Sequence, residues 1–202
     1  MSNAFYTLPP SPCLVDTNYA WWQGGFTPEQ LAAIVALGES LPAQRGTVFA
    51  ADGKTQQEVE QIRRTHIAWM YYNDQSRWVY ELLGWIANQL NATNFGFDLY
   101  GFVDALQYTL YEATESGPGF YDWHMDQGRT SSPRKLSLVL QLTDPSEYEG
   151  GDLQFMGTNT TVATKERGSV HFFPSYVMHR VTPVTKGIRR SLVGWIAGPR
   201  FR

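Results

Sequence analysis

The chain has 202 residues, a net charge of −3 at neutral pH and a pI of about 5.8; 43% of its residues are hydrophobic and 17% are charged. This length buries a core without disulfides, and this composition excludes a disordered chain. Nucleic-acid-binding proteins usually carry a basic footprint, so the acidic balance argues against a nucleic-acid partner.

The cysteine content and the N-terminus bear on the compartment. The single cysteine, Cys13, excludes an internal disulfide framework and fits a reducing environment, so we expect a cytoplasmic protein. The first residues, MSNAFYTLPPSPCLV, lack a positive n-region and an apolar h-region and predict no secretory signal. No apolar run approaches the length of a membrane span, so no membrane partner is expected. The oligomeric state is not indicated.

Two helices are predicted in the first half. The first covers residues 28–41, with Thr27 as N-cap, Pro28 at the first helical position and Gln30 placed for a capping box. Gly38 weakens its last turn. The second helix covers residues 76–90, and residues 46–57 between the helices read as a loop. The apolar stripes of the two helices are Leu31, Ile34, Leu37 and Leu41, and then Trp78, Leu82, Leu83, Ile86 and Leu90.

From Ala105 onward the pattern changes to short β-type runs separated by turn-forming stretches. Such a series predicts a sandwich or barrel. We expect one compact domain in which a helical and extended region, residues 1–104, supports a barrel formed by residues 105–202. The eight predicted strands are residues 105–112, 120–126, 135–143, 151–156, 160–164, 168–174, 177–184 and 189–197.

The stretch YDWHMDQG contains two candidate metal ligands. His124 and Asp126 flank one residue, so in a strand both point to the same face. His179, in a later predicted strand, offers a third ligand. Two histidines and one carboxylate with open positions form the facial triad of non-haem Fe(II) oxygenases. An HxD pattern also occurs by chance, and Asp126 can instead cap a turn, because Gln127 and Gly128 follow.

A candidate anion site follows the third ligand. Arg189, ten residues after His179, shares a strand face with Ser191, Val193 and Trp195. A buried arginine is costly unless it meets an anion, and a guanidinium beside a hydroxyl suits a carboxylate. The alternative for Arg189 is a surface ion pair.

The predicted strand 135–143 has two different faces. Leucines occupy one face, which the helices can cover, whereas Ser137, Val139 and Gln141 occupy the other. This second face is either the lining of a pocket or a partly exposed strand surface. His66 and His171 are interpreted as structural, and we expect His171 to lie in the core. The leucines are Leu136, Leu138, Leu140 and Leu142.

The chain resembles the Fe(II)/2-oxoglutarate-dependent dioxygenases, and among them the prolyl 4-hydroxylase-like group that includes the bacterial PKHD-type hydroxylases. The segments that carry this resemblance are YDWHMD, RKLSLVLQLTDPSEYEGGDLQF and GSVHFFPSYVMHRVTPVTKGIRRSLVGW, within residues 105–196. The combination of HxD, distal histidine, downstream arginine and DPxxYxGG turn is specific. The resemblance implies a mainly β fold, a double-stranded β-helix (a jelly-roll, cupin-like barrel) with N-terminal helices packed on its outer sheet.

The resemblance also implies roles for individual residues. His124, Asp126 and His179 are the catalytic Fe(II) ligands, and Arg189 takes the distal carboxylate of 2-oxoglutarate. Tyr121, Trp123 and Arg129 are expected near the substrate. The residues expected to bind or surround the co-substrate are Arg189, Ser191, Tyr111, Gln141, Ser137, Val181, Leu153 and Trp195.

The implied activity is hydroxylation of an unactivated C–H bond with Fe(II), 2-oxoglutarate and O2, supported by ascorbate in vitro. The resemblance favours a peptidyl side chain such as proline, and a free amino acid or other small molecule is the alternative. Residues 46–73 are a candidate lid. Two competing classes are a non-catalytic metal-binding barrel and a hydrolytic zinc enzyme. The latter needs a general base, for which no motif is present.

Overall fold

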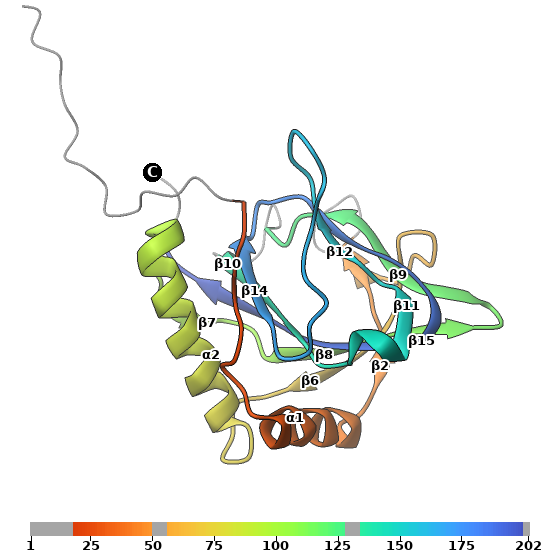
Figure 1. The fold of residues 1–202 in the computed structure, drawn as a ribbon, viewed down its shortest axis with the longest axis horizontal. Helices are drawn as coiled ribbons and strands as arrows, with labels where there is room; N and C mark the ends of the chain where they lie inside the picture. The colour runs from red at the N-terminus through yellow and green to blue at the C-terminus, as the bar shows by residue number, and fades with distance from the viewer. Residues whose placement is uncertain (1–17, 50–55, 128–133, 200–202) are drawn as a thin grey trace, which may run out of the picture.

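One long strand organises the fold. The computed structural model describes residues 18–49, 56–127 and 134–199, and strand β15 spans His179–Ala197. Antiparallel pairing around β15 joins most strands into a jelly-roll barrel, the mainly β fold that the sequence predicts (Figure 1). The first part of β15 pairs with β9 (Gly117–His124), β11 (Tyr148–Gly150) and β12 (Leu153–Phe155), and its last part pairs with β7 (Gly101–Phe102), β8 (Leu106–Thr114) and β10 (Arg134–Gln141).

The two parts of β15 pair with two different sets of strands, and further strands extend the set at its last part. β14 (Val170–Pro174) lies between β10 and β1 (Ala20–Trp22), and β6 (His66–Met70) lies between β8 and β2 (Gln44–Arg45). The first half of the chain therefore adds strands to the barrel as well as helices. The shorter elements are β3 (Val48–Phe49), β4 (Gln56–Gln57), β5 (Arg63–Arg64), β13 (Thr161–Val162), a π-helical turn at Asn91–Phe95 and a 3-10 turn at Pro145–Glu147.

Two sequence-based expectations were wrong. Residues 177–184 and 189–197 were predicted as separate strands joined by a turn, but β15 runs through both because Tyr148 and Glu149 of β11 pair with Gly187 and Lys186. Gly187 has φ 72°, and a Cβ there would collide with the carbonyl of Glu147. Glycine at this position therefore allows β15 to continue beside β11. The expected loop 46–57 contains the paired strands β3 and β4.

Helix α1, Pro28–Ser40, begins as predicted. Thr27 Oγ1 accepts a hydrogen bond from the Gln30 amide, and Gln30 Oε1 accepts one from the Thr27 amide, which completes the capping box. Gly38, which disturbed the sequence pattern, lies against the ring of Tyr108, where a Cβ would collide. Glycine at this position therefore allows the last turn of the helix to approach the sheet.

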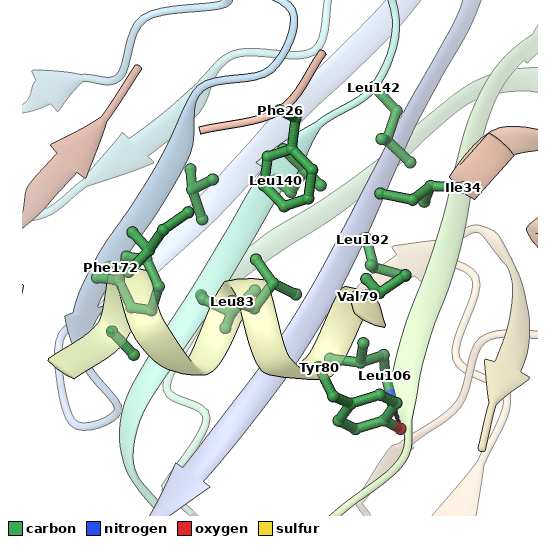
Figure 2. Packing of buried hydrophobic residues seen from close by; sticks show 14 of the residues in the cluster. Phe26, Ile34, Val79, Tyr80, Leu83, Leu106, Leu140, Leu142, Phe172 and Leu192 are labelled. Atoms are coloured by element: carbon green, nitrogen blue, oxygen red, sulfur yellow. Dashed lines mark hydrogen bonds between the residues drawn. The ribbon is translucent and has the colours of Figure 1, made fainter. Parts of the chain in front are cut away.

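Helix α2, Arg77–Leu90, buries one face against the same sheet. Figure 2 shows Val79, Tyr80 and Leu83 between the helix and strand residues such as Leu140 and Leu192. Trp78 and Leu82 of the predicted stripe are only partly buried. No helix among the described residues is long and apolar enough to cross a membrane. The buried residues of α2 are Val79, Tyr80, Leu83, Ile86, Ala87 and Leu90.

The predicted leucine face of β10 is confirmed. Its leucines lie in the large apolar cluster beneath the two helices, and Figure 2 shows Leu140 and Leu142 within that cluster. On the opposite face, Val139 belongs to a second cluster inside the barrel, together with Val181 and Leu153. The helices therefore stabilise the sheet from outside and leave the barrel interior to other residues. The leucines are Leu136, Leu138 and Leu140 of β10 and Leu142, the residue after its end.

The packing of α2 gives a stability prediction. Leu83 is fully buried, so Leu83→Ala should lower the free energy of unfolding by roughly 2–5 kcal/mol, through lost transfer energy and the cavity left behind. Gln89→Ala, at an exposed position of the same helix, should change it by less than about 0.5 kcal/mol. Urea unfolding followed by circular dichroism measures both, and equal losses would contradict the burial of Leu83 beneath α2.

Candidate metal centre

Strand pairing brings the two candidate histidine ligands together. His124 ends β9 and His179 begins β15, and the two residues are direct partners in the antiparallel register. Their ring centroids are 4.2 Å apart. Asp126 lies two residues beyond the end of β9, so the expectation that it shares a strand with His124 was wrong. The turn nevertheless places its carboxylate 3.7 Å from His124 Nε2 and 3.6 Å from His179 Nε2.

Backbone carbonyls fix the orientation of both imidazole rings. His124 Nδ1 lies 2.7 Å from the carbonyl oxygen of Asp122, and His179 Nδ1 lies 3.0 Å from that of Val177. A carbonyl oxygen only accepts, so each Nδ1 carries the proton and each Nε2 presents a lone pair to the space beside Asp126. Histidines that bind metals are commonly oriented by such a bond from the other ring nitrogen.

The protonation states suit metal binding. Burial, and then repulsion from His179, lower the pKa of His124 to about 3, so its imidazole is neutral near pH 7. Burial by itself would raise the pKa of Asp126, but His179, His124, Ser137 and Arg134 together bring it below its usual value. The site therefore offers a neutral imidazole and a carboxylate, the forms in which these groups bind a cation.

The three side chains fit one metal ion. Their ligand atoms all lie within 4.8 Å of one another. Two ligand bonds of about 2.1 Å to one ion can bridge the 3.6 and 3.7 Å separations between nitrogen and carboxylate oxygen. All three side chains line one cavity, so they would hold an ion at its wall, with the two histidines and one carboxylate that a facial triad requires.

Arg189, a fully buried side chain on β15, lines the same cavity. Its Nη2 donates to Gln141 Oε1 at 2.9 Å, its Nη1 lies 3.5 Å from Ser191 Oγ, and its Nε has no partner among the described residues. No carboxylate of the described residues pairs with it, so the proposed surface ion pair is absent from that part of the chain. A buried guanidinium without a counter-ion is costly unless an anion binds.

The GG turn at the end of β11, Gly150 and Gly151, makes room for Arg189. Gly150 and Gly151 have φ values of 74° and 64°, which favour glycine. A Cβ on Gly150 would collide with the carbonyl of Pro183, and one on Gly151 would lie 2.9 Å from Arg189 Cδ. The turn thus passes so close to β15 that a larger residue would displace the arginine.

A cavity of about 160 Å³ joins the metal ligands to Arg189. This volume exceeds the share of a single water molecule several times and has room for a small molecule. Ten of the residues predicted from the sequence line it: His124, Asp126, His179, Arg189, Ser191, Tyr111, Tyr121, Val181, Leu153 and Trp195.

Three other predicted residues do not line the cavity. Gln141 holds Arg189, Ser137 Oγ lies 2.9 Å from Ser175 Oγ and lowers the pKa of Asp126, and Trp123 packs under the guanidinium of Arg180 at 4.6 Å. Arg129 lies outside the described residues.

The first half of the chain forms part of the cavity wall. From the sequence, residues 46–73 were predicted only as a candidate lid, without individual residues. Ile67 and Trp69 alternate along β6 and face the cavity, and this period-two pattern was the available signal. No pattern in the sequence marked the others, because their approach depends on pairing across the barrel. The cavity residues not singled out in advance include Gln44, Thr47, Val48, Arg63 and Gln107.

The comparisons with known proteins agree with this geometry. Residues 106–197 match the family model of the 2OG-Fe(II) oxygenase superfamily. The chain is 45% identical over 89 residues to a PKHD-type hydroxylase of Synechococcus sp. strain CC9311, a match that covers 43% of this chain and 40% of that protein. A PKHD-type hydroxylase of Hyphomonas neptunium is 40% identical over 88 residues and is matched over 39% of its length. The matches therefore span about two fifths of these curated relatives.

Solved structures show the same fold at low sequence identity. A prolyl-4-hydroxylase of Pseudomonas putida has a TM-score of 0.64 and 21% identity, covering 93% of this chain and 95% of that one. A prolyl hydroxylase of Trichoplax adhaerens, solved with a peptide fragment of the hypoxia inducible factor oxygen degradation domain, has a TM-score of 0.72 and 15% identity, covering 90% and 84%.

His171 is a core residue, as the sequence predicted, and not a candidate ligand. It is fully buried on β14, with Nε2 3.0 Å from the carbonyl oxygen of Thr164. Burial lowers its pKa to about 4; the Thr164 carbonyl acts against that shift and Arg189 adds to it. The folded chain therefore keeps this imidazole neutral at pH values at which an unfolded chain binds a proton.

This difference predicts a loss of stability in acid. Because the folded pKa of His171 lies below the unfolded value of about 6.5, stability is unaffected above that pH and falls between about 6.5 and 4. The loss attributable to His171 is on the order of 3 kcal/mol at most. Urea unfolding between pH 7 and 4.5 should show a smaller pH slope for His171→Gln than for the wild type. His66→Gln, at an exposed position on β6, is the control for removing an imidazole; equal slopes in all three proteins would contradict the prediction.

Proposed function

We propose that this chain is an Fe(II)- and 2-oxoglutarate-dependent dioxygenase that hydroxylates an unactivated C–H bond; the match of residues 106–197 to the family model of the 2OG-Fe(II) oxygenase superfamily supports this proposal. The observation that carries the proposal is one cavity lined by both a metal-ligand triad and a buried arginine that no carboxylate of the described residues neutralises. A metal alone would leave Arg189 without an anion. A dicarboxylate that reaches both the metal and Arg189 uses both features.

His124, Asp126 and His179 would hold Fe(II), and Arg189 with Ser191 would bind the distal carboxylate of 2-oxoglutarate. When bound, Fe(II), 2-oxoglutarate and O2 supply the oxidising power that hydroxylates a C–H bond. The contribution of the chain is to orient these groups: the carbonyls of Asp122 and Val177 hold the ligand rings in the metal-binding tautomer.

The other predicted residues support that arrangement. Gln141 aligns the Arg189 guanidinium through its 2.9 Å hydrogen bond, and Ser137 helps keep Asp126 ionised. Tyr111 is buried with Arg189 5.2 Å from its ring centroid, so we assign it a contact to the co-substrate. The apolar wall of Val181, Leu153 and Trp195 limits water at the reacting centre.

We further propose that the substrate is a peptidyl side chain such as proline, with a free amino acid as the second candidate. Support for a peptide comes from the shared fold with the Trichoplax prolyl hydroxylase, which was solved with a peptide fragment. Met125 is 51% exposed and lines the cavity, so the cavity opens to solvent beside the ligands. Tyr121 lines the same cavity, with its ring centroid 3.5 Å from that of His124, and we assign Tyr121, Trp123 and Arg129 to the substrate side.

The cavity does not favour a hydrolytic zinc enzyme. Asp126 is the only carboxylate among the described residues that line it, and the two histidines there are the other candidate ligands. No further carboxylate or imidazole of those residues is therefore placed to activate a metal-bound water as a general base.

The first test is uncoupled turnover. The anaerobically iron-loaded protein, given 2-oxoglutarate, ascorbate and air, should form succinate slowly, and a substrate peptide should accelerate it. His179→Ala should reduce succinate at least about 100-fold, because removing a ligand leaves the metal poorly held. Succinate is quantified by mass spectrometry, and circular dichroism confirms folding.

The matched control is His66→Ala, at an exposed position on a strand that takes no part in the triad. It should retain wild-type succinate formation. A wild-type protein that binds iron but forms no succinate with any substrate would overturn the proposal in favour of a non-catalytic metal-binding barrel.

Arg189 gives a second prediction. Arg189→Met should weaken 2-oxoglutarate binding by roughly 30-fold or more, because a charged hydrogen-bonded pair is lost. Arg190→Met is the matched control, since Arg190 pairs with Glu39 on the outer side of β15 at 2.9 Å. Anaerobic calorimetry of the iron-loaded proteins measures the affinity. Arg189→Lys, which keeps the charge, should be intermediate; unchanged affinity in both Arg189 variants would contradict the assignment.

A further inference from the structure

A second buried arginine lines the cavity on the side that the first half of the chain provides. Arg63, on β5, is only 9% exposed, and β5 pairs with β9 so that Arg63 lies opposite Tyr121. Its guanidinium carbon is 4.6 Å from the centroid of the Tyr121 ring, and the same ring stacks on His124 at 3.5 Å. One aromatic ring therefore separates Arg63 from a metal ligand.

The described part of the chain holds this guanidinium in place but does not neutralise it. Arg63 Nε donates to Thr65 Oγ1 at 2.9 Å, and Nη1 donates to the carbonyl of Thr47 at 3.0 Å. Among the described residues no carboxylate lies within ion-pair distance of Arg63, and its Nη2 has no hydrogen-bond partner there. Gly46 packs so closely that a Cβ would collide with Thr65 Oγ1 and lie 2.5 Å from Arg63 Nε. The position is therefore built around the arginine.

The other arginines near Arg63 differ from it in this respect. Arg134 also lines the cavity, but Asp104 pairs with it at 2.8 Å and its guanidinium lies 3.9 Å from the Trp195 ring centroid. Arg64, the neighbour of Arg63, donates to the carbonyl of Ser116 at 2.6 Å and does not line this cavity. Arg63 therefore places a positive charge in the cavity wall. Among the described residues its Nη2 group has no acceptor and its charge has no counter-ion.

The charges of the proposed function balance without Arg63. The two positive charges of Fe(II) and the one of Arg189 equal the negative charges of Asp126 and the two carboxylates of 2-oxoglutarate. Arg134 and Asp104 cancel each other. Among the described residues one buried positive charge is left over, and leaving it uncompensated in a wall of aromatic and aliphatic side chains is costly. The component of the reaction that remains to be placed is the substrate.

Resting on the proposed function, we propose that the substrate carries a carboxylate close to the carbon that is hydroxylated, and that Arg63 binds this carboxylate. The free Nη2 group and the second Nη1 hydrogen offer the paired donors that a carboxylate accepts. The carboxylate comes either from the α-carboxyl group of a free or C-terminal amino acid or from an acidic side chain next to the modified residue. Arg63 is then a specificity-determining residue that discriminates acids from neutral analogues.

The experiment compares acid and neutral partners that differ in one group. The first pair is N-acetyl-L-proline and N-acetyl-L-prolinamide, and the second is the blocked peptides Ac-Ala-Pro-Asp-NH2 and Ac-Ala-Pro-Asn-NH2. Binding is measured anaerobically by calorimetry on the full chain loaded with Fe(II) and 2-oxoglutarate, where no turnover occurs. Hydroxylation in air is then followed by mass spectrometry. The readout is the ratio of acid to neutral affinity within each protein, which a general loss of binding does not change.

The wild type should bind the acidic member of at least one pair roughly 10- to 100-fold more tightly, the worth of a hydrogen bond to a charged group. The pair that shows this preference identifies the source of the carboxylate. Arg63→Gln should bring the ratio close to one, and Arg63→Lys, which keeps the charge but loses the fork, should retain part of it. Arg64→Gln, the matched control, should keep the full ratio.

Several results would overturn the inference. A wild type that binds no acidic probe more tightly than its neutral partner excludes a carboxylate subsite, and a preference that survives in Arg63→Gln assigns it to another residue. Both can occur while uncoupled succinate formation is intact, and then only this inference fails. Absence of succinate together with an acid preference that depends on Arg63 would instead leave the anion site standing and reject the oxygenase.

Discussion

Backbone pairing along β15 is the constraint on which the site depends. The strand begins at His179, opposite His124, and ten residues later it presents Arg189 to the same cavity. Because antiparallel partners hold β15 on both sides, the candidate metal ligands and the candidate carboxylate anchor keep a fixed separation. A rigid strand positions two groups more accurately than loops do, which suits a small molecule that must reach both. The glycines of the GG turn and Gly187 allow neighbouring chain to approach this strand closely.

Buried charge is the second theme of the molecule. Asp126, Arg189 and Arg63 all lie within or beside a wall of aromatic and aliphatic side chains, where an unpaired charge is expensive. The described part of the chain offers hydrogen bonds to these groups but no ion pairs between the two arginines and a carboxylate. Burying these charges is unfavourable for folding, and binding of an oppositely charged ligand would offset that free-energy cost. Such preorganised charge is typical of sites that select ligands by electrostatics.

Much of the fold could be predicted because local rules decided it. The capping box at Thr27, the leucine face of β10 and the period-two runs after Ala105 all appear in the structure, since caps and alternation are properties of neighbouring residues. The extent of β15 could not be predicted, because a TKG stretch is a normal turn signal and only pairing with β11 keeps it extended. The contribution of Arg63 to the cavity could not be predicted for the same reason, because strands far apart in sequence meet across the barrel.

By itself, the sequence determined the residue types of the site: two histidines, one carboxylate and a downstream arginine at spacings that match a facial triad and an anion anchor. It also determined that helices cover one face of the sheet, because each helix and the strand at residues 135–143 has an apolar face that its own sequence specifies. Only the tertiary structure decided that Asp126 reaches both histidines from beyond the end of β9, that Gln141 aligns Arg189 instead of lining the cavity, and that Arg63 lies one ring away from His124. These outcomes depend on strand register and on which side chains line the same cavity. Both are fixed by the packing of the whole chain and not by any one segment.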